Sequence, residues 1–344
     1  MKIRQLSLAA SLVLSLVLSV GCHYVNRISG WGNGGVYVAG SEGAVAMLWK
    51  NGTAQVLGDK KGYSSAASVF VTFRHVYAAG QEEDIYGKYI ATLWKDGVAE
   101  RLSNGEADSY AHCVHVSGGD VYVAGHIETW QGKKMATLWR NGTAERIGGE
   151  DTNAVACSVY VSGKDVYVAG FEETANGNNV AVLWKNGTPQ QLSEGTSAYA
   201  RANSVVVTGK DVYVAGVEDN TIGNNIAMMW KNGFALRLSD GTTNGVALSI
   251  CVPKKEAFVA GRFETPADKR VAMTWKGSEA VPVCQDMGPC VANSIFVSGG
   301  DVYAAVTESD GEQLKYAGYI VKNGEATRLG DPDKVVEALG VYVR

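Results

Sequence analysis

The chain has little charge, few histidines and no helical hydrophobic pattern. Charged residues make up 19% of its 344 residues, and the net charge is −4. A balance of this kind, without runs of like charge, excludes an ordinary nucleic-acid-binding surface. No apolar period of 3.6 residues occurs, which excludes a helical solenoid. The sequence also lacks Cys-x-x-Cys and Gly-x-Ser-x-Gly, so it indicates no zinc ribbon, thiol oxidoreductase or nucleophile elbow, and no cofactor is predicted.

The chain does contain a repeat. A hexapeptide related to Asp-Val-Tyr-Val-Ala-Gly occurs seven times, at spacings of 40, 45, 45, 46, 45 and 44 residues. Its closing small residues are Gly40, Gly80, Gly125, Gly170, Gly216, Gly261 and Ala305. A tryptophan keeps the same period in six units, with Val321 in the seventh slot: Trp49, Trp94, Trp139, Trp184, Trp230 and Trp275. Periods of this size are typical of solenoids and propellers.

Each repeat predicts four strands. In one unit, apolar or β-branched runs cover residues 154–162, 165–170, 180–185 and 188–192. The last two are joined by Asn186-Gly187, and Asn-Gly between such runs is the strongest short hairpin pattern because both residues accept positive φ. Four strands at a period of about 45 residues predict radial blades of antiparallel sheet around a channel.

The ends of the chain predict how the ring closes. The first unit lacks the strand that elsewhere precedes the hexapeptide, and residues 335–343 match that strand. We therefore expect residues 36–344 to form an all-β, seven-bladed β-propeller whose C-terminal strand completes blade 1, which removes open sheet edges. The strand order resembles that of kelch propellers, although the kelch double glycine and second tryptophan are missing. The resemblance concerns topology and implies no particular activity.

The N-terminus predicts export. Lys2 and Arg4 precede an apolar run too short to span a membrane, and residues 1–21 are typical of a signal peptide. The segment Ser19-Val20-Gly21-Cys22 resembles a bacterial lipobox, although Ser19 stands where leucine is usual. The resemblance implies that Cys22 is acylated and held in a lipid bilayer, with residues 22–35 as a tether, at the outer membrane, facing the periplasm or on the cell surface. Ordinary cleavage near Gly21 with release is the alternative.

Residues that keep the period are predicted to be scaffold, and one set among them is acidic. The recurring tryptophans and tyrosines should fill the space between blades. Acidic residues lie three positions past the closing small residue in six units: Glu83, Glu128, Glu173, Asp219, Glu264 and Glu308. Loops of the variable face contain them, where they either accept backbone N–H bonds or bind a cationic ligand or supply acid and base groups.

Residues that break the period are the candidates for binding. Trp130 and Tyr86 lie in loops between second and third strands, and Tyr110, Tyr199 and Arg201 lie at or near the starts of inner strands. Exposed aromatic side chains near an arginine suit stacking on sugars or contacts with proteins. A glycan, a peptide or an envelope protein is therefore the predicted partner at the loop face.

The histidines and cysteines give weaker predictions. Pairing of Ala111 opposite His126 would place His112 on the other side of the sheet, so no metal site is predicted from His112, His126 and Glu128. Cys284 and Cys290 could form a disulfide in an oxidising compartment. Cys113 and Cys157 lie on inner strands of adjacent units, where they could meet, and Cys251 is left over.

Two functions remain open at this stage. The first is a non-catalytic binding scaffold of the bacterial envelope that presents its variable loops to a ligand or protein. The alternative is an extracytoplasmic glycan-active enzyme, a hydrolase, lyase or epimerase, that uses loop-face carboxylates such as Glu128 and Glu173. Two carboxylates about 5–10 Å apart over a cleft would favour the enzyme.

Overall fold

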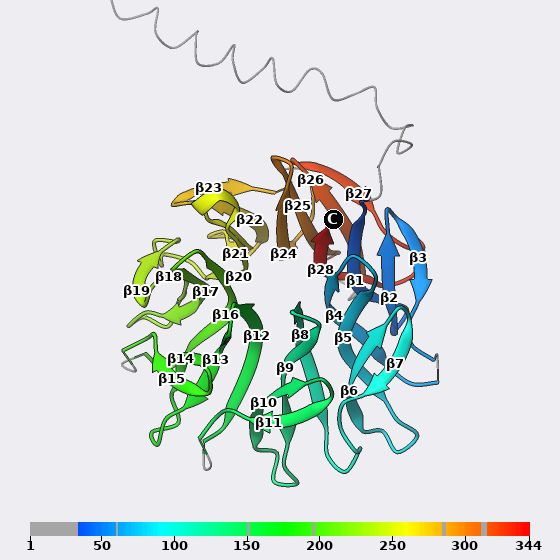
Figure 1. Ribbon diagram of the computed structural model, residues 1–344. Coiled ribbons are helices and arrows are strands. Elements are labelled where there is room, and N and C mark those ends of the chain that lie inside the picture. Colours follow the sequence, from blue (N-terminus) through cyan, green and yellow to red (C-terminus); the bar gives the residue numbers. More distant parts are fainter. Residues whose placement is uncertain (1–33, 60, 150–151, 195–196, 284–286, 311–314) are drawn as a thin grey trace, which may run out of the picture. The chain divides into compact units, whose positions relative to one another are not determined.

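Seven four-stranded antiparallel sheets form the body of the protein, as Figure 1 shows. The computed structural model describes residues 34–59, 61–149, 152–194, 197–283, 287–310 and 315–344. Residues 36–344 form one compact unit. The predicted fold class, an all-β propeller with seven blades, is confirmed. Within the described residues, no helix has the length and apolar character needed to cross a membrane.

Every blade has an inner, a second, a third and an outer strand, counted from the axis of the ring. The inner strands are β28 (Val336–Val343) of blade 1 and, for blades 2 to 7, β4 (Ser64–Val71), β8 (Ser109–Ser117), β12 (Ala154–Ser162), β16 (Ala200–Thr208), β20 (Gly245–Cys251) and β24 (Cys290–Ser298). The second strands contain the hexapeptide: β1 (Val36–Glu42), β5 (Val76–Glu83), β9 (Asp120–Glu128), β13 (Asp165–Glu173), β17 (Asp211–Asp219), β21 (Phe258–Glu264) and β25 (Asp301–Ser309).

The outer half of each blade is a hairpin. Its third strands are β2 (Val45–Lys50), β6 (Tyr89–Lys95), β10 (Lys134–Arg140), β14 (Asn179–Lys185), β18 (Asn225–Lys231), β22 (Arg270–Lys276) and β26 (Tyr316–Lys322). Its outer strands are β3 (Thr53–Val56), β7 (Val98–Arg101), β11 (Thr143–Arg146), β15 (Thr188–Gln191), β19 (Phe234–Arg237), β23 (Glu279–Pro282) and β27 (Glu325–Arg328). A short 3₁₀ helix, η1 (Pro253–Lys255), follows β20.

The ring closes as the sequence predicts. Strand β28 pairs antiparallel with β1, from Val36 opposite Val343 to Glu42 opposite Val336. Blade 1 is therefore built from both ends of the propeller, and the two ends of the repeat array are held together by a sheet.

Apolar clusters between neighbouring blades make up the core. The six repeated tryptophans are each at most 1% exposed, and each lies in a cluster with residues of the preceding blade. Trp184 of blade 4, for example, shares a cluster with Tyr122 and Leu138 of blade 3. Burial of six indoles in the wedges between sheets removes large apolar side chains from water and so stabilises the contacts between blades.

Pairing in blade 7 corrects one alignment made from the sequence. In blade 4, Ala156 lies opposite Gly170, but in blade 7 the corresponding Ala292 lies opposite Val306. Val306, rather than Ala305, therefore occupies the closing position of the seventh hexapeptide. Glu308 accordingly lies two positions past it, where blade 4 has Glu172, and does not belong to the set of acids three positions past the closing residue.

Candidate functional site

A β-bulge in the inner strand of every blade prepares the most unusual cluster of side chains. Each inner strand has one residue without a partner on the second strand. This residue directly follows the alanine that recurs in the inner strand of every blade. The seven unpaired residues are Leu339, Ala67, His112, Cys157, Asn203, Leu248 and Asn293 in blades 1 to 7. A bulge bends its strand and redirects the side chains on either side of it.

In blade 3 the bulge brings two histidines together. Tyr110 pairs opposite His126, and the extra residue in the strand is His112. His112 Nε2 lies 3.0 Å from His126 Nδ1, and the rings stack with centroids 5.1 Å apart. This corrects the sequence-based prediction that His112 and His126 lie on opposite sides of the sheet, because that prediction assumed a regular ladder.

Glu128 lies behind this pair. Its Oε1 is 3.6 Å from His126 Nε2, an atom that is buried and has no hydrogen-bond partner among the described residues. Proximity of a carboxylate favours the tautomer in which His126 Nε2 carries the proton. His126 Nδ1 then accepts the hydrogen bond from His112 Nε2, and the lone pair of His112 Nδ1 remains free to accept a proton.

A half-buried arginine from blade 5 completes the cluster. Arg201 Nε donates to Cys157 Sγ of blade 4 at 3.2 Å, and the guanidinium lies 5.8 Å from the ring centre of Phe171. The pKa of Arg201 is raised, first by Cys157 and then by Tyr199, while burial acts in the opposite direction. The cluster thus contains a fixed positive charge in surroundings where little water can screen it.

Burial and this charge keep both imidazoles neutral. Burial, followed by Arg201 and Lys134, lowers the pKa of His112 to about 3. Burial, followed by His112, Lys134 and Arg201, lowers the pKa of His126 to about 2. Burial also raises the pKa of Tyr110, which stacks on His126 with ring centres 4.8 Å apart, to about 12. At neutral pH the cluster therefore offers neutral imidazoles, a phenol and one guanidinium.

This arrangement combines a proton acceptor with an anion-binding group. The hydrogen bond between His126 and His112 orients one imidazole against the other, and Arg201 supplies a cation to which a substrate carboxylate or a developing oxyanion could bind. No group of three or more histidine, cysteine or acidic side chains suited to a metal occurs in the part of the chain that the structure describes.

Most of the loop-face acids serve the loops beside them. Tyr63 N–H donates to Glu83 at 2.9 Å and Tyr199 N–H donates to Asp219 at 3.1 Å. The side-chain amides of Asn153 and Asn244 donate to Glu173 and Glu264. The Gly288 N–H donates to Glu308. Glu128 differs because its nearest ionisable neighbour among the described residues is the imidazole of His126.

The aromatic residues that break the repeat separate into two groups. Trp130 is 90% exposed and Tyr86 is 83% exposed, each in a five-residue loop between second and third strands. A cleft of about 540 Å³ lies beside the Trp130 loop and is lined by residues that include Lys133, Asn153 and Glu173. Tyr110 and Arg201 are instead part of the histidine cluster, and Tyr199 supports Arg201.

The cysteine predictions have mixed outcomes. Cys113 and Cys157 are free thiols near each other, and Cys113 contacts Ser158 of the next blade at 3.8 Å. Cys290 is a buried free thiol whose sulfur accepts the Ala272 N–H at 3.3 Å. Cys284 lies outside the described residues, so its pairing with Cys290 stays a prediction. Cys22 and the predicted signal peptide, residues 1–21, also lie outside them, so both stay predictions.

Sequence reasoning named Arg201 and Tyr110 as binding candidates and Cys157 only as a residue that could meet Cys113. It did not predict the contact of Cys157 with Arg201 or the pairing of the histidines. The only sequence pattern that distinguishes the site is the occurrence of His112 and Cys157 at a position where most blades have Ala, Asn or Leu. The bulge brings those side chains next to the second strand, but the residue types around it do not indicate that a bulge is present.

Comparison with known proteins gives the fold. No protein-family model matches the chain, and no curated protein matches it in sequence. The β-propeller domain of the Trilobed protease from Pyrococcus furiosus superposes with a TM-score of 0.51 at 10% identity, over 88% of this chain and 96% of that one. The acylaminoacyl peptidase of Pyrococcus horikoshii gives 0.47 at 12% identity over 78% of this chain, which spans only 46% of the peptidase. A puromycin hydrolase gives 0.44 at 10% identity, over 78% and 54%.

These findings correct the functional prediction made from the sequence. The ring that this chain matches over most of its length is a domain of a protease, so the architecture is one that hydrolases use. A non-catalytic scaffold is therefore not retained, and neither is the glycan-active alternative. The likeness itself, at 10% identity, shows the fold alone.

Proposed function

We propose that the protein is a hydrolase that acts on an anionic substrate at the cluster formed by Tyr110, His112, His126, Glu128 and Arg201. The observation that carries the proposal is the 3.0 Å contact between His112 Nε2 and His126 Nδ1, with Glu128 behind it. An imidazole held by a second imidazole, with a carboxylate 3.6 Å from the far nitrogen, is an arrangement suited to general-base catalysis.

The reaction follows from the atoms available. A water molecule loses a proton to His112 Nδ1 while its oxygen attacks a substrate carbonyl, and Arg201 stabilises negative charge on the substrate. The proton then passes to the leaving group as the bond to the carbonyl carbon breaks. Peptide amides are the first substrate class to examine, because the propeller of similar fold belongs to a protease.

Substrate binding itself would strengthen the base. Arg201 is one of the causes that lower the pKa of both histidines. A substrate carboxylate that pairs with Arg201 screens this positive charge, so the pKa of His112 rises towards the range in which an imidazole accepts protons efficiently. The site is therefore least basic when empty and more basic when an anion occupies it.

The loop face would extend the substrate site. Trp130 and Tyr86 offer exposed aromatic surface on this face, and the cleft beside Trp130 supplies polar groups for a peptide backbone.

Two further proposals rest on sequence patterns alone. The order of the strands is the only support for a propeller of the kelch type. Membrane attachment through acylated Cys22, at the outer membrane, facing the periplasm or on the cell surface, is likewise proposed from the lipobox resemblance. Mass spectrometry of the mature N-terminus, with Cys22→Ala as control, tests that attachment.

The function is tested by incubating the full chain with peptide and ester panels that carry free carboxylates and analysing the products by mass spectrometry. We expect His112→Gln to lower kcat by about 10²–10⁴-fold. Arg201→Lys should raise KM more than it lowers kcat. Leu248→Ala, at the bulge of blade 6, is the matched control and should keep parental activity. Absence of hydrolysis by the parent across both panels, or parental activity of His112→Gln, would overturn the proposal.

A further inference from the structure

The interfaces between blades repeat one pair of large side chains. The tryptophan of each third strand lies in the same apolar cluster as a large aliphatic residue on the third strand of the preceding blade. Leu48, Leu93, Leu138, Leu183 and Met229 fill this aliphatic position in blades 1 to 5, and all are buried. The pair closes the outer half of each interface.

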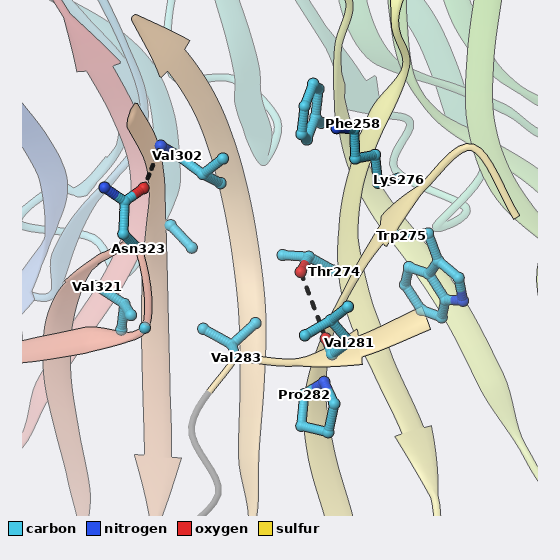
Figure 2. Close-up of a pocket in the computed structure, with 12 residues that line it drawn as sticks. Phe258, Thr274, Trp275, Lys276, Val281, Pro282, Val283, Val302, Val321 and Asn323 are labelled. Carbon is cyan, nitrogen blue, oxygen red and sulfur yellow. Dashed lines mark hydrogen bonds between the residues drawn. The ribbon is translucent and has the colours of Figure 1, made fainter. Parts of the chain in front are cut away.

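At the interface between blades 6 and 7, both the tryptophan and its aliphatic partner are replaced by smaller residues. Val321 of β26 stands where other blades have tryptophan. Thr274 of β22 stands where blades 1 to 5 have leucine or methionine and blade 7 has Ile320. Ala304 of β25 faces the same space, where most blades have valine. A cleft of about 270 Å³ results, and Figure 2 shows Thr274, Val321 and Val283 around it.

The rest of this interface keeps the composition that holds an indole elsewhere. Around Trp184, blade 3 presents Tyr122, Ala124, Ala136 and Ile147. The corresponding residues of blade 6 are Phe258, Ala260, Ala272 and Val283, and all belong to or pack against the cluster that contains Val321. One wall of an indole slot is therefore conserved in this interface, while the indole that would fill it is missing.

We propose that this cleft binds a small, uncharged, planar aromatic molecule of the indole class. An empty apolar space costs stability, because its lining loses contacts that a ligand can restore. Apolar cavities smaller than this one bind benzene-sized molecules in other proteins. The volume lies just below the range usual for drug-sized ligands, so the occupant is the size of a bicyclic ring and not of a peptide.

The polar groups around the cleft fit a neutral occupant. Thr274 Oγ1 donates to the Val281 carbonyl at 3.3 Å, and the Asn323 side chain accepts the Val302 N–H at 2.8 Å. Lys276 pairs with Glu256 at 3.1 Å, so its charge is already compensated. An indole N–H needs no dedicated partner here: Trp49, Trp94, Trp139, Trp184 and Trp230 all bury theirs without one among the described residues.

Titration of the full-length protein with 5-fluoroindole, followed by ¹⁹F NMR, tests the proposal. We expect one saturable site with a Kd on the order of 0.1–1 mM, as is usual for a ligand of so few atoms. Val321→Trp should fill the cleft, raise the Tm and weaken binding at least ~10-fold. Thr274→Leu is the second variant, and should weaken binding in the same direction if Val321→Trp does not fold.

A gain of binding elsewhere is the stricter control. The double substitution Leu138→Thr and Trp184→Val copies the small pair into the interface between blades 3 and 4, and should increase the stoichiometry from one to two. His112→Gln should bind 5-fluoroindole as the parent does, so that failure of the hydrolase proposal leaves this result unaffected. Unsaturable binding to the parent, or a folded Val321→Trp protein with the parental Kd, would overturn the proposal.

Discussion

His112 Nε2 lies 3.0 Å from His126 Nδ1, although a regular hairpin would place these two side chains on opposite faces of the sheet. The bulge between Ala111 and Cys113 is the cause, because one extra residue changes which side chains meet across the ladder. A bulge that recurs in every blade is scaffold, but in blade 3 it also assembles the most perturbed pair of titratable groups in the described chain.

Acid should destabilise the protein through this pair. The pKa of His112 falls to about 3 and that of His126 to about 2, against 6.5 in the unfolded chain. Between pH 6.5 and about 3 the unfolded chain binds protons that the folded chain does not, so the free energy of unfolding decreases as the pH falls. We expect each histidine to contribute a slope of about 1.4 kcal/mol per pH unit within this window.

Urea denaturation between pH 4 and pH 8 measures that slope. His112→Gln should flatten it below pH 6 and leave it unchanged at pH 7 to 8, where imidazole is neutral in both states. Equal slopes for the parent and this variant at pH 4 to 6 would show that His112 does protonate in the folded protein.

Gly125 should tolerate no side chain. A Cβ there would lie 1.9 Å from the Tyr110 carbonyl oxygen and 2.9 Å from the Trp139 ring, and neither group can move without disrupting the blade. We expect Gly125→Ala to lower the free energy of unfolding by about 3 kcal/mol or more. Thermal denaturation measures the loss. Gly118→Asn is the control, since Gly118 has a φ of 62° and open space around its Cβ position, a conformation that asparagine accepts.

The repeat allowed the ring of blades to be predicted from the sequence, whereas the residues that meet in the histidine cluster could be identified only from the three-dimensional structure. The Asn186-Gly187 turn and the period of Trp184 are local patterns with one structural solution, so blade number and strand order followed from them. Ring closure followed from a missing strand at one end and a spare one at the other. The seventh hexapeptide was misaligned by one residue because Ala305 resembles a closing small residue more than Val306 does.

The histidine cluster depends on geometry that residue types do not encode. Ala111 and Cys113 flank a bulge, and a repeat of similar composition could form a regular ladder without one. Arg201 reaches Cys157 from the next blade, across 44 positions of sequence. Likewise, Val321 was visible as a break in the tryptophan period, but the matching loss of size at Thr274 became meaningful only when both residues faced one cleft.

Removal of the C-terminal strand should open the ring. Strand β28 supplies the partner for β1 and shares apolar clusters with blade 7 through Val336 and Ala338. A chain that ends at residue 334 leaves β1 as an exposed edge, and such edges pair with other molecules. We expect association in size-exclusion chromatography and a lower Tm. Adding back a peptide of residues 335–344 should restore the monomer, and association that persists with excess peptide would contradict this explanation.

Glu83 and Glu128 occupy equivalent positions, and their substitution should separate structure from function. The Glu83 carboxylate accepts the Tyr63 N–H at 2.9 Å, so Glu83→Ala leaves that donor without its acceptor and should cost about 1–2 kcal/mol of stability. Hydrolytic activity should remain parental, because the Glu83 carboxylate bonds to Tyr63 of blade 2 and not to the histidine pair. Glu128→Gln should instead keep most of the stability and lower kcat, because a neutral amide no longer stabilises the His126 Nε2–H tautomer or the charge that develops on the imidazole pair. Denaturant unfolding and peptide hydrolysis, measured on the same preparations, distinguish the two effects. If both variants lost stability equally and kept activity, Glu128 would be one more carboxylate that supports its loop.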